Sequence, residues 1–123
     1  MKAILVVDDE KITLKLIAEI ISQLGYYPIL ATDGERAQSV LEDNPKIAGI
    51  LTDYQMPNVD GLEFLTDIRL NDKFKSLPIM VFSAYISLRE ISAVLDKGAH
   101  AFMPKPIAKR NIQDFLETYV GLD

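Results

Sequence analysis

The stretch AILVVDD, residues 3–9, runs five apolar residues directly into two carboxylates. An apolar run of this length predicts a strand that is buried on both faces of a parallel sheet. A second run, residues 47–52, also ends at an acid, Asp53. Because the carboxyl ends of parallel strands form one edge of a sheet, we expect these acids to lie near one another.

The apolar residues between such runs follow a helical spacing of three or four. Further strands are predicted at residues 27–31, 78–82 and 99–103. Helices are predicted over residues 34–41 and around the apolar positions in 16–24, 62–68, 91–95 and 112–120. Five strands alternating with five helices predict an α/β fold with a doubly wound parallel sheet.

The composition is that of an ordinary globular domain, and it excludes several kinds of site. Of 123 residues, 49% are hydrophobic and 25% are charged, with a net charge of −5. Such an acidic chain suits neither nucleic acid nor an anionic membrane. Without cysteine there are no disulfides or thiolate metal sites, and the single histidine, His100, cannot form a histidine-rich centre. No apolar run is long enough for a membrane span or a signal peptide, so a soluble cytoplasmic domain is predicted.

Polar side chains follow four of the five predicted strands: Asp8, Asp9, Asp53, Ser83 and Lys105. Singly, each has an ordinary explanation such as a helix cap, a turn or a solvated charge. Three converging carboxylates, however, repel one another by about 3 kcal/mol per pair at about 5 Å and an effective dielectric near 20. Lys105 offsets one charge, and a bound cation would offset the others. Because only oxygen ligands are available, the predicted cation is Mg²⁺.

This set of groups suits phosphoryl chemistry. Carboxylates, Mg²⁺, a hydroxyl and a lysine together can stabilise a phosphoryl group in transit. The sequence contains neither a P-loop nor a G-x-G-x-x-G motif. The phosphoryl group is therefore expected on a side chain rather than on a bound nucleotide, since a carboxylate can become an aspartyl phosphate.

Four segments carry a family resemblance. They are VVDDE at residues 6–10, DYQMPNVDG at 53–61, SA at 83–84 and GAHAFMPKP at 98–106. In order and spacing they resemble the signature segments of the response-regulator receiver domain of two-component signalling, and the likeness spans the whole chain. Its family pattern is similar to that of single-domain chemotaxis regulators.

The resemblance implies a role for each matching position. Asp53 is the phosphoacceptor, and Asp8, Asp9, Asp53 and the backbone carbonyl of Gln55 hold Mg²⁺. Ser83 and Lys105 contact the phosphoryl group, Ser83 and Phe102 form the switch, and the Lys105–Pro106 peptide bond is cis. Gln55 and Tyr85 occupy positions that tune the lifetime of the phosphoryl group. We expect the bulky Tyr85 to cover that group and slow its hydrolysis.

The resemblance also implies the remaining architecture and the partners. The sheet order is 2-1-3-4-5, as in flavodoxin-like folds, and residues 1–123 form one receiver domain with no output domain in this chain. The phosphodonor is a sensor histidine kinase or a histidine phosphotransfer protein, and an unknown downstream protein reads the switch. The chain is not expected to be an enzyme beyond its own phosphorylation and dephosphorylation. Phe102 lacks the hydroxyl of a tyrosine. Packing alone is therefore expected to decide between its two orientations in the switch.

Alternative functions share parts of this pattern. An aspartyl-phosphate phosphatase or phosphotransferase of the haloacid-dehalogenase type needs an Asp-x-Asp pair, whereas Asp8 and Asp9 are adjacent. In a flavin carrier of this architecture, these acids would face the negatively charged phosphate of the cofactor. A degenerate receiver would act only as an interaction module, although all five functional positions are retained here. A phosphorelay intermediate remains open, because it would use the same residues.

The first helix is predicted to bury the stripe Leu16, Ile17, Ile20, Ile21 and Leu24. Leu14 and Ala18 then lie on its opposite face, beside the predicted phosphorylation site. A phosphodonor helix could dock on this apolar pair.

Overall fold

The computed structural model describes residues 1–122, so residue 123, the last of the predicted domain, lies outside the described residues. The elements in chain order are β1 (Ala3–Val7), α1 (Lys11–Gln23), β2 (Tyr27–Ala31), α2 (Gly34–Asp43), β3 (Gly49–Asp53), α3 (Gly61–Leu70), the short 3-10 helix η1 (Asp72–Phe74), β4 (Ile79–Ser83), α4 (Leu88–Asp96), β5 (Ala101–Pro104), α5 (Lys109–Phe115) and the π-helical turn η2 (Leu116–Val120).

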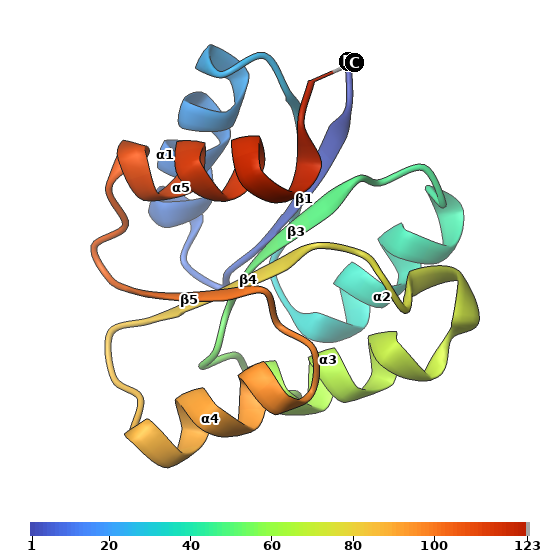
Figure 1. Cartoon of the computed structure of the whole chain (residues 1–123), viewed down its shortest axis with the longest axis vertical. Helices are drawn as coiled ribbons and strands as arrows, with labels where there is room; N and C mark the ends of the chain where they lie inside the picture. Colours follow the sequence, from blue (N-terminus) through green and yellow to red (C-terminus); the bar gives the residue numbers. More distant parts are fainter. Residues whose placement is uncertain (123) are drawn as a thin grey trace.

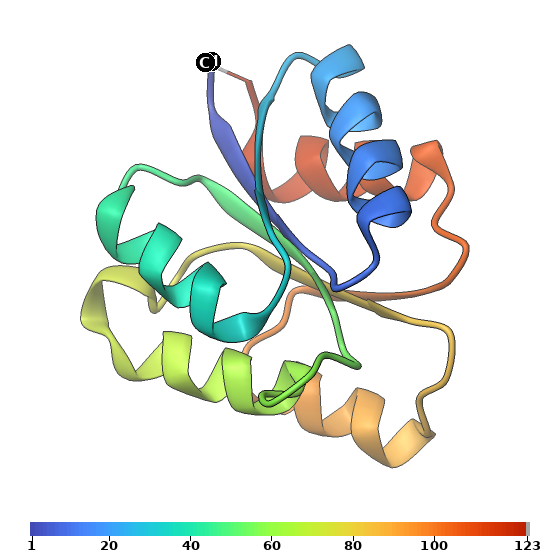
Figure 2. The ribbon, with the colours of Figure 1, turned by 180° about the vertical axis from the view of Figure 1, so that it is seen from behind.

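The strands form one sheet in the order β2-β1-β3-β4-β5, and all four neighbouring pairs are parallel. The predicted α/β fold and strand order are therefore confirmed. In Figures 1 and 2, α1 and α5 cover one face of the sheet, whereas α2, α3 and α4 cover the other. Among the described residues, no helix is both long and apolar enough to pass through a bilayer.

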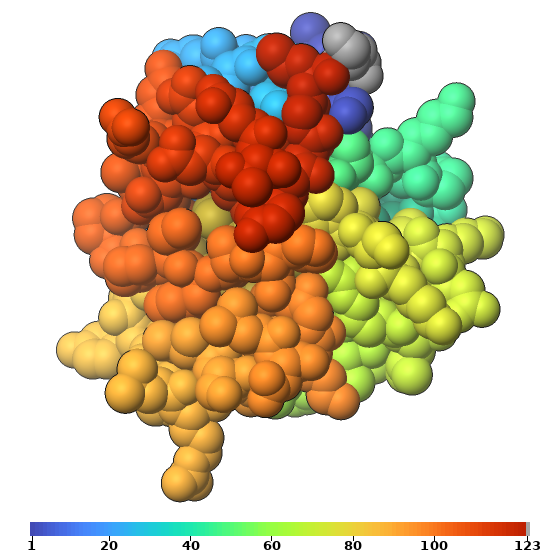
Figure 3. All heavy atoms as spheres, viewed as in Figure 1, coloured from blue at the N-terminus to red at the C-terminus, as the bar shows by residue number. Residues whose placement is uncertain are grey.

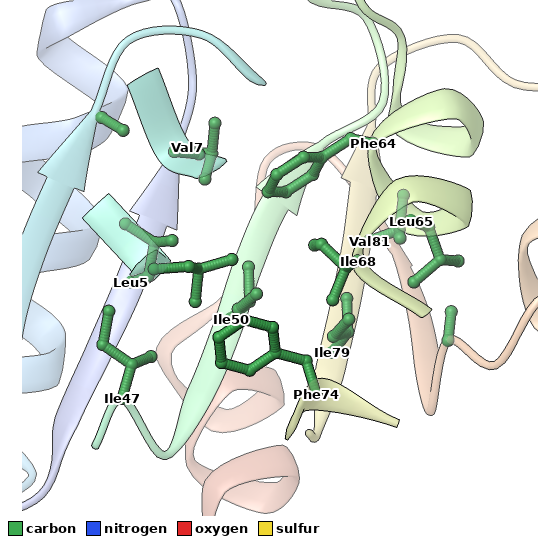
Figure 4. Close-up of a cluster of buried hydrophobic side chains, with 14 of the residues drawn as sticks. Leu5, Val7, Ile47, Ile50, Phe64, Leu65, Ile68, Phe74, Ile79 and Val81 are labelled. Carbon is green, nitrogen blue, oxygen red and sulfur yellow. The ribbon is translucent and has the colours of Figure 1, made fainter. Parts of the chain in front are cut away.

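Two buried clusters, one on each face of the sheet, hold these layers together. Successive residues of β1 point to opposite faces, so Leu5 and Val7 join the cluster beneath α2 and α3, whereas Ile4 and Val6 join the cluster beneath α1 and α5. Figure 4 shows the first cluster, in which Phe64 of α3 lies over the central strands. Full burial of each large apolar side chain contributes roughly 1.5–3 kcal/mol.

The central strands end later than the sequence predicts. Runs expected to end at residues 52 and 82 continue for one more residue, because the ladder pairs Asp53 with Phe82 and Ser83 with Pro104. Both functional side chains thus stand on the last residue of a strand, where backbone hydrogen bonds fix them. The last strand, expected at 99–103, runs from Ala101 to Pro104.

The buried face of α1 differs from the prediction. Leu14 is 4% exposed and packs with Ile17 and Ile21 in the core, whereas Leu16 is 58% exposed. Helical spacing permits both stripes; packing against β1 and α5 selects the one that contains Leu14. The predicted docking pair of Leu14 and Ala18 is therefore wrong.

The C-terminal helix also departs from the predicted regular pattern. After Phe115 it widens into η2, whose π geometry is seen in the bond from Gly121 N–H to Leu116 O at 2.7 Å. Leu116 stays in the core, but Tyr119 turns outward and meets the ring of His100 edge-on at 5.0 Å. His100 has a structural role there, as its Nδ1 accepts from Ile79 N–H at 3.3 Å.

The α1 correction can be tested with a matched pair of variants on one helix. Leu14→Ala should lower the free energy of unfolding by about 2–5 kcal/mol, because it opens a cavity in the core. Leu16→Ala should change it by no more than about 0.5 kcal/mol. Urea unfolding followed by circular dichroism measures both, and a larger loss for Leu16→Ala would contradict the assigned face.

Candidate phosphoacceptor and cation site

The site lies at the carboxyl ends of the central strands. Asp8 follows β1, Asp53 ends β3, Ser83 ends β4, and Lys105 follows β5. Because these strands are parallel and adjacent, the sheet delivers all four residues to one edge. Asp8, Asp53 and Ser83 are the buried polar residues here, together with Thr52.

Asp8 is held from two sides. Its Oδ1 accepts from the backbone N–H of Glu10 at 2.9 Å, which fixes the turn that starts α1. Its Oδ2 lies 3.0 Å from Lys105 Nζ, but outside hydrogen-bond geometry. This buried oxygen therefore has an ion-pair contact without a hydrogen-bond donor, and it retains capacity for another ligand.

Asp53 shares the same ammonium. Lys105 Nζ donates to Asp53 Oδ2 at 3.1 Å, while Oδ1 receives only a long 3.4 Å contact from Gln55 N–H. The backbone around it is fixed, since Tyr54 N–H donates to Phe82 O at 2.9 Å. Asp53 is thus a buried, rigidly placed carboxylate with one weakly engaged oxygen.

Burial governs the charges of this cluster. It raises the pKa of Asp8, although the Glu10 N–H and Lys105 oppose the rise. It also raises the pKa of Asp53, with the negative charge of Asp8 as the second cause and Lys105 in opposition. For Lys105, burial acts to lower the pKa, but the two carboxylates outweigh it and raise the pKa. The positive charge of Lys105 is therefore too small to balance the carboxylates of the site.

A divalent cation fits this deficit. The exposed Asp9 joins Asp8 and Asp53, and one carboxylate oxygen of each lies within 4.8 Å of the others. Three carboxylates and one ammonium leave a formal charge of −2. A set of hard oxygens, one of them buried without a donor, is what Mg²⁺ prefers. The Gln55 carbonyl stays a predicted ligand.

The predicted switch and lifetime residues are placed as follows. Ser83 Oγ contacts Gln55 Oε1 at 2.6 Å, and the Gln55 amide nitrogen donates to Tyr85 O. Tyr85 is 84% exposed, so its side chain does not cover Asp53, and the steric reason to expect slow hydrolysis fails. The Gln55 side-chain amide is thus hydrogen-bonded at both its oxygen and its nitrogen. Phe102 is half-buried against the core, and the Lys105–Pro106 peptide bond is cis.

Residues 4–117 match the family described as the response regulator receiver domain. This chain belongs to that family. It is 29% identical over 119 residues to the chemotaxis protein CheY1 of Helicobacter pylori, covering 96% of each chain. It is 30% identical over 109 residues to the rice two-component response regulator ORR11, covering 89% of this chain and 74% of that protein.

Solved structures agree with this assignment. The CheX–CheY–BeF₃–Mg²⁺ complex of Borrelia burgdorferi matches with a TM-score of 0.88 and 28% identity, over 95% of this chain and 87% of that one. CheY4 of Vibrio cholerae matches in fold with a TM-score of 0.89 and 24% identity, over 97% and 98% of the two chains. Receiver domains are signalling switches that bind Mg²⁺ at an acidic pocket and interact with histidine kinases and downstream targets.

The raised pKa of Asp53 predicts a pH-dependent stability. Without divalent cations, the folded protein holds the Asp53 proton to a higher pH than the unfolded chain does, so ionisation costs stability as the pH rises through the folded pKa. Asp53→Asn removes this cost and should raise the free energy of unfolding by about 1–3 kcal/mol near pH 8.

Urea titrations in EDTA at several pH values measure this difference, which should vanish below the pKa of an unfolded Asp. The exposed Asp67→Asn serves as the control. Should Asp53→Asn prove less stable than the parent at pH 8, the assigned electrostatics would be wrong.

Proposed function

We propose that this chain is a cytoplasmic phosphorylation switch whose Asp53 accepts a phosphoryl group from a histidine kinase or a histidine phosphotransfer protein. The observation that carries the proposal is the pair of buried carboxylates, Asp8 and Asp53, that shares the single ammonium of Lys105 beside the exposed Asp9. The matching relative that carries BeF₃ and Mg²⁺ supports it.

The chemistry follows from these groups. A carboxylate oxygen of Asp53 attacks the phosphorus, the P–O bond forms, and the P–N bond to the donor histidine breaks. Mg²⁺ bound by Asp8, Asp9 and Asp53 would supply positive charge against the phosphoryl oxygens. Lys105 already contacts Asp53 and supplies a second positive charge, and Ser83 supplies a hydroxyl once it turns towards the group.

The substrate of this reaction is the chain's own Asp53, so we class the protein as a switch and not as an enzyme with a separate substrate. A phosphatase or phosphotransferase of the Asp-x-Asp type is disfavoured, because Asp8 and Asp9 are adjacent and lack the intervening residue of that motif. A phosphorelay intermediate would use the same site and would pass the group on to another histidine. No contact among residues 1–122 favours such a relay over an output role.

The surface that would report phosphorylation is formed by α4, β5 and α5, which make up much of the face in Figure 3. Phe102 of β5 lies half-buried within it, and Leu88 and Leu95 of α4 are exposed. Movement of Ser83 towards Asp53 would make room for Phe102 to turn. A downstream protein, in chemotaxis or in another two-component pathway, would bind the altered face.

The phosphodonor would approach on the other side of the site. A cavity of about 370 Å³ opens between α1 and the loop after β5, and its lining joins Leu16 and Ile20 to Pro106 and Ile107, beside Lys105. We therefore propose this groove, and not the Leu14–Ala18 pair, as the docking site of the phosphodonor. A helix that carries the phosphohistidine could lay an apolar face here.

The phosphorylation itself is tested by mass spectrometry after incubation with acetyl phosphate and Mg²⁺. We expect one phosphoryl adduct that is lost in Asp53→Asn, kept in the control Asp67→Asn, and absent in EDTA. Full labelling of Asp53→Asn would refute the assignment of the phosphoacceptor.

The donor groove is tested by Leu16→Asp, which places a charge on the apolar wall. Transfer from a phosphorylated histidine partner should slow about tenfold or more, as for an interface residue worth over 1 kcal/mol. Labelling by acetyl phosphate should be unchanged. Leu70→Asp, at another exposed leucine, is the control. Equal slowing with both donors would show that the groove is not a docking site.

A further inference from the structure

A closed ring of hydrogen bonds joins Ser83, Gln55 and Tyr85. The Ser83 hydroxyl donates to Gln55 Oε1 at 2.6 Å, and Gln55 Nε2 donates to Tyr85 O. The backbone N–H of Tyr85 donates back to Ser83 Oγ at 3.2 Å, which closes the ring. Each member donates once and accepts once.

In this ring, the hydroxyl proton of Ser83 is used in the bond to Gln55. A serine hydroxyl has one proton to donate. Ser83 Oγ also lies 2.9 Å from Tyr85 O, but its distance to Gln55 Oε1 is only 2.6 Å. Two oxygens at that separation repel unless a proton lies between them, so the proton belongs to the Ser83–Gln55 contact. A phosphoryl oxygen on Asp53 would need this same proton, so the bond to Gln55 and a bond to the phosphoryl group exclude each other.

We propose that Gln55 is a positioning residue that holds Ser83 in the unphosphorylated arrangement by competing for its hydroxyl proton. The proposal rests on the proposed phosphorylation of Asp53 and adds a regulatory role at that site. Gln55 stands two residues after Asp53, and its backbone N–H lies 3.4 Å from Asp53 Oδ1. One residue therefore contacts the phosphoacceptor through its backbone and the switch hydroxyl through its side chain.

The size of the effect follows from one hydrogen bond. The phosphoryl group must break the Ser83–Gln55 bond, so its apparent affinity is reduced by the free energy of that bond. A net hydrogen bond of about 0.5–1.5 kcal/mol corresponds to about a 2- to 12-fold change in affinity. Removal of the Gln55 amide should tighten binding of a phosphoryl analogue by this factor.

The test is a titration of the parent chain and of Gln55→Met with beryllofluoride in the presence of Mg²⁺, followed by NMR. Methionine keeps the length of the side chain but offers no amide. Gln55→Met should bind about 2- to 12-fold more tightly. Gln38→Met, which removes an amide from α2, should bind like the parent.

A second background separates the hydrogen bond from a steric effect. In Ser83→Ala the contested proton is absent, so Gln55→Met should then produce no gain, and the double-mutant cycle should show the coupling. In the metal-free protein, hydrogen exchange of the Tyr85 amide should be faster in Gln55→Met than in the parent, because the ring is broken.

The outcomes distinguish this proposal from the function on which it rests. If the parent binds no beryllofluoride, the proposed phosphorylation and this role of Gln55 both fail. If the parent binds but Gln55→Met binds equally or more weakly, or if its gain persists in Ser83→Ala, only the role of Gln55 is refuted.

Discussion

The structure depends on two buried carboxylates that share one ammonium. Asp8 follows β1 and Asp53 ends the neighbouring β3, so the pairing of these two strands sets the separation of the carboxylates. Lys105 reaches both from beyond β5. Burial of such charges is costly unless they are paired, and one lysine cannot pair fully with two acids. The fold therefore maintains a deficit of positive charge at one edge of the sheet, and that deficit favours a divalent cation. The charge of such a cation would offset the carboxylates and would allow an anionic phosphoryl group to approach.

Two different structural features flank this pair of carboxylates. On one side, α1 and the loop after β5 line an apolar groove beside Lys105, which is our proposed docking site for the phosphodonor. On the other side, Ser83 and Gln55 connect the site to the loop before α4 through Tyr85. In our proposal, the phosphodonor and the downstream protein therefore contact different sides of the site.

The sequence was sufficient for the fold class, the strand order through the family resemblance, and the residues at the strand ends. The boundaries of β1 and β2 were predicted without error, because charged or turn residues bound short apolar runs. The buried face of α1 was not, because α1 carries apolar residues on more than one face and only tertiary packing decides between Leu14 and Leu16. The outward ring of Tyr85 and the Ser83–Gln55 bond depend on rotamers, for which the sequence holds no local signal.

The most direct test of the charge deficit is an Mg²⁺ titration of Lys105→Met and of the parent, followed by the NMR shifts of the amides near Asp8, Asp9 and Asp53. The ammonium of Lys105 contacts the same carboxylates that would hold the cation. If these acids form the cation site, Lys105→Met should bind Mg²⁺ at the same residues about tenfold more tightly or better. Binding that is unchanged or weaker, or shifts that centre on other residues, would contradict the account.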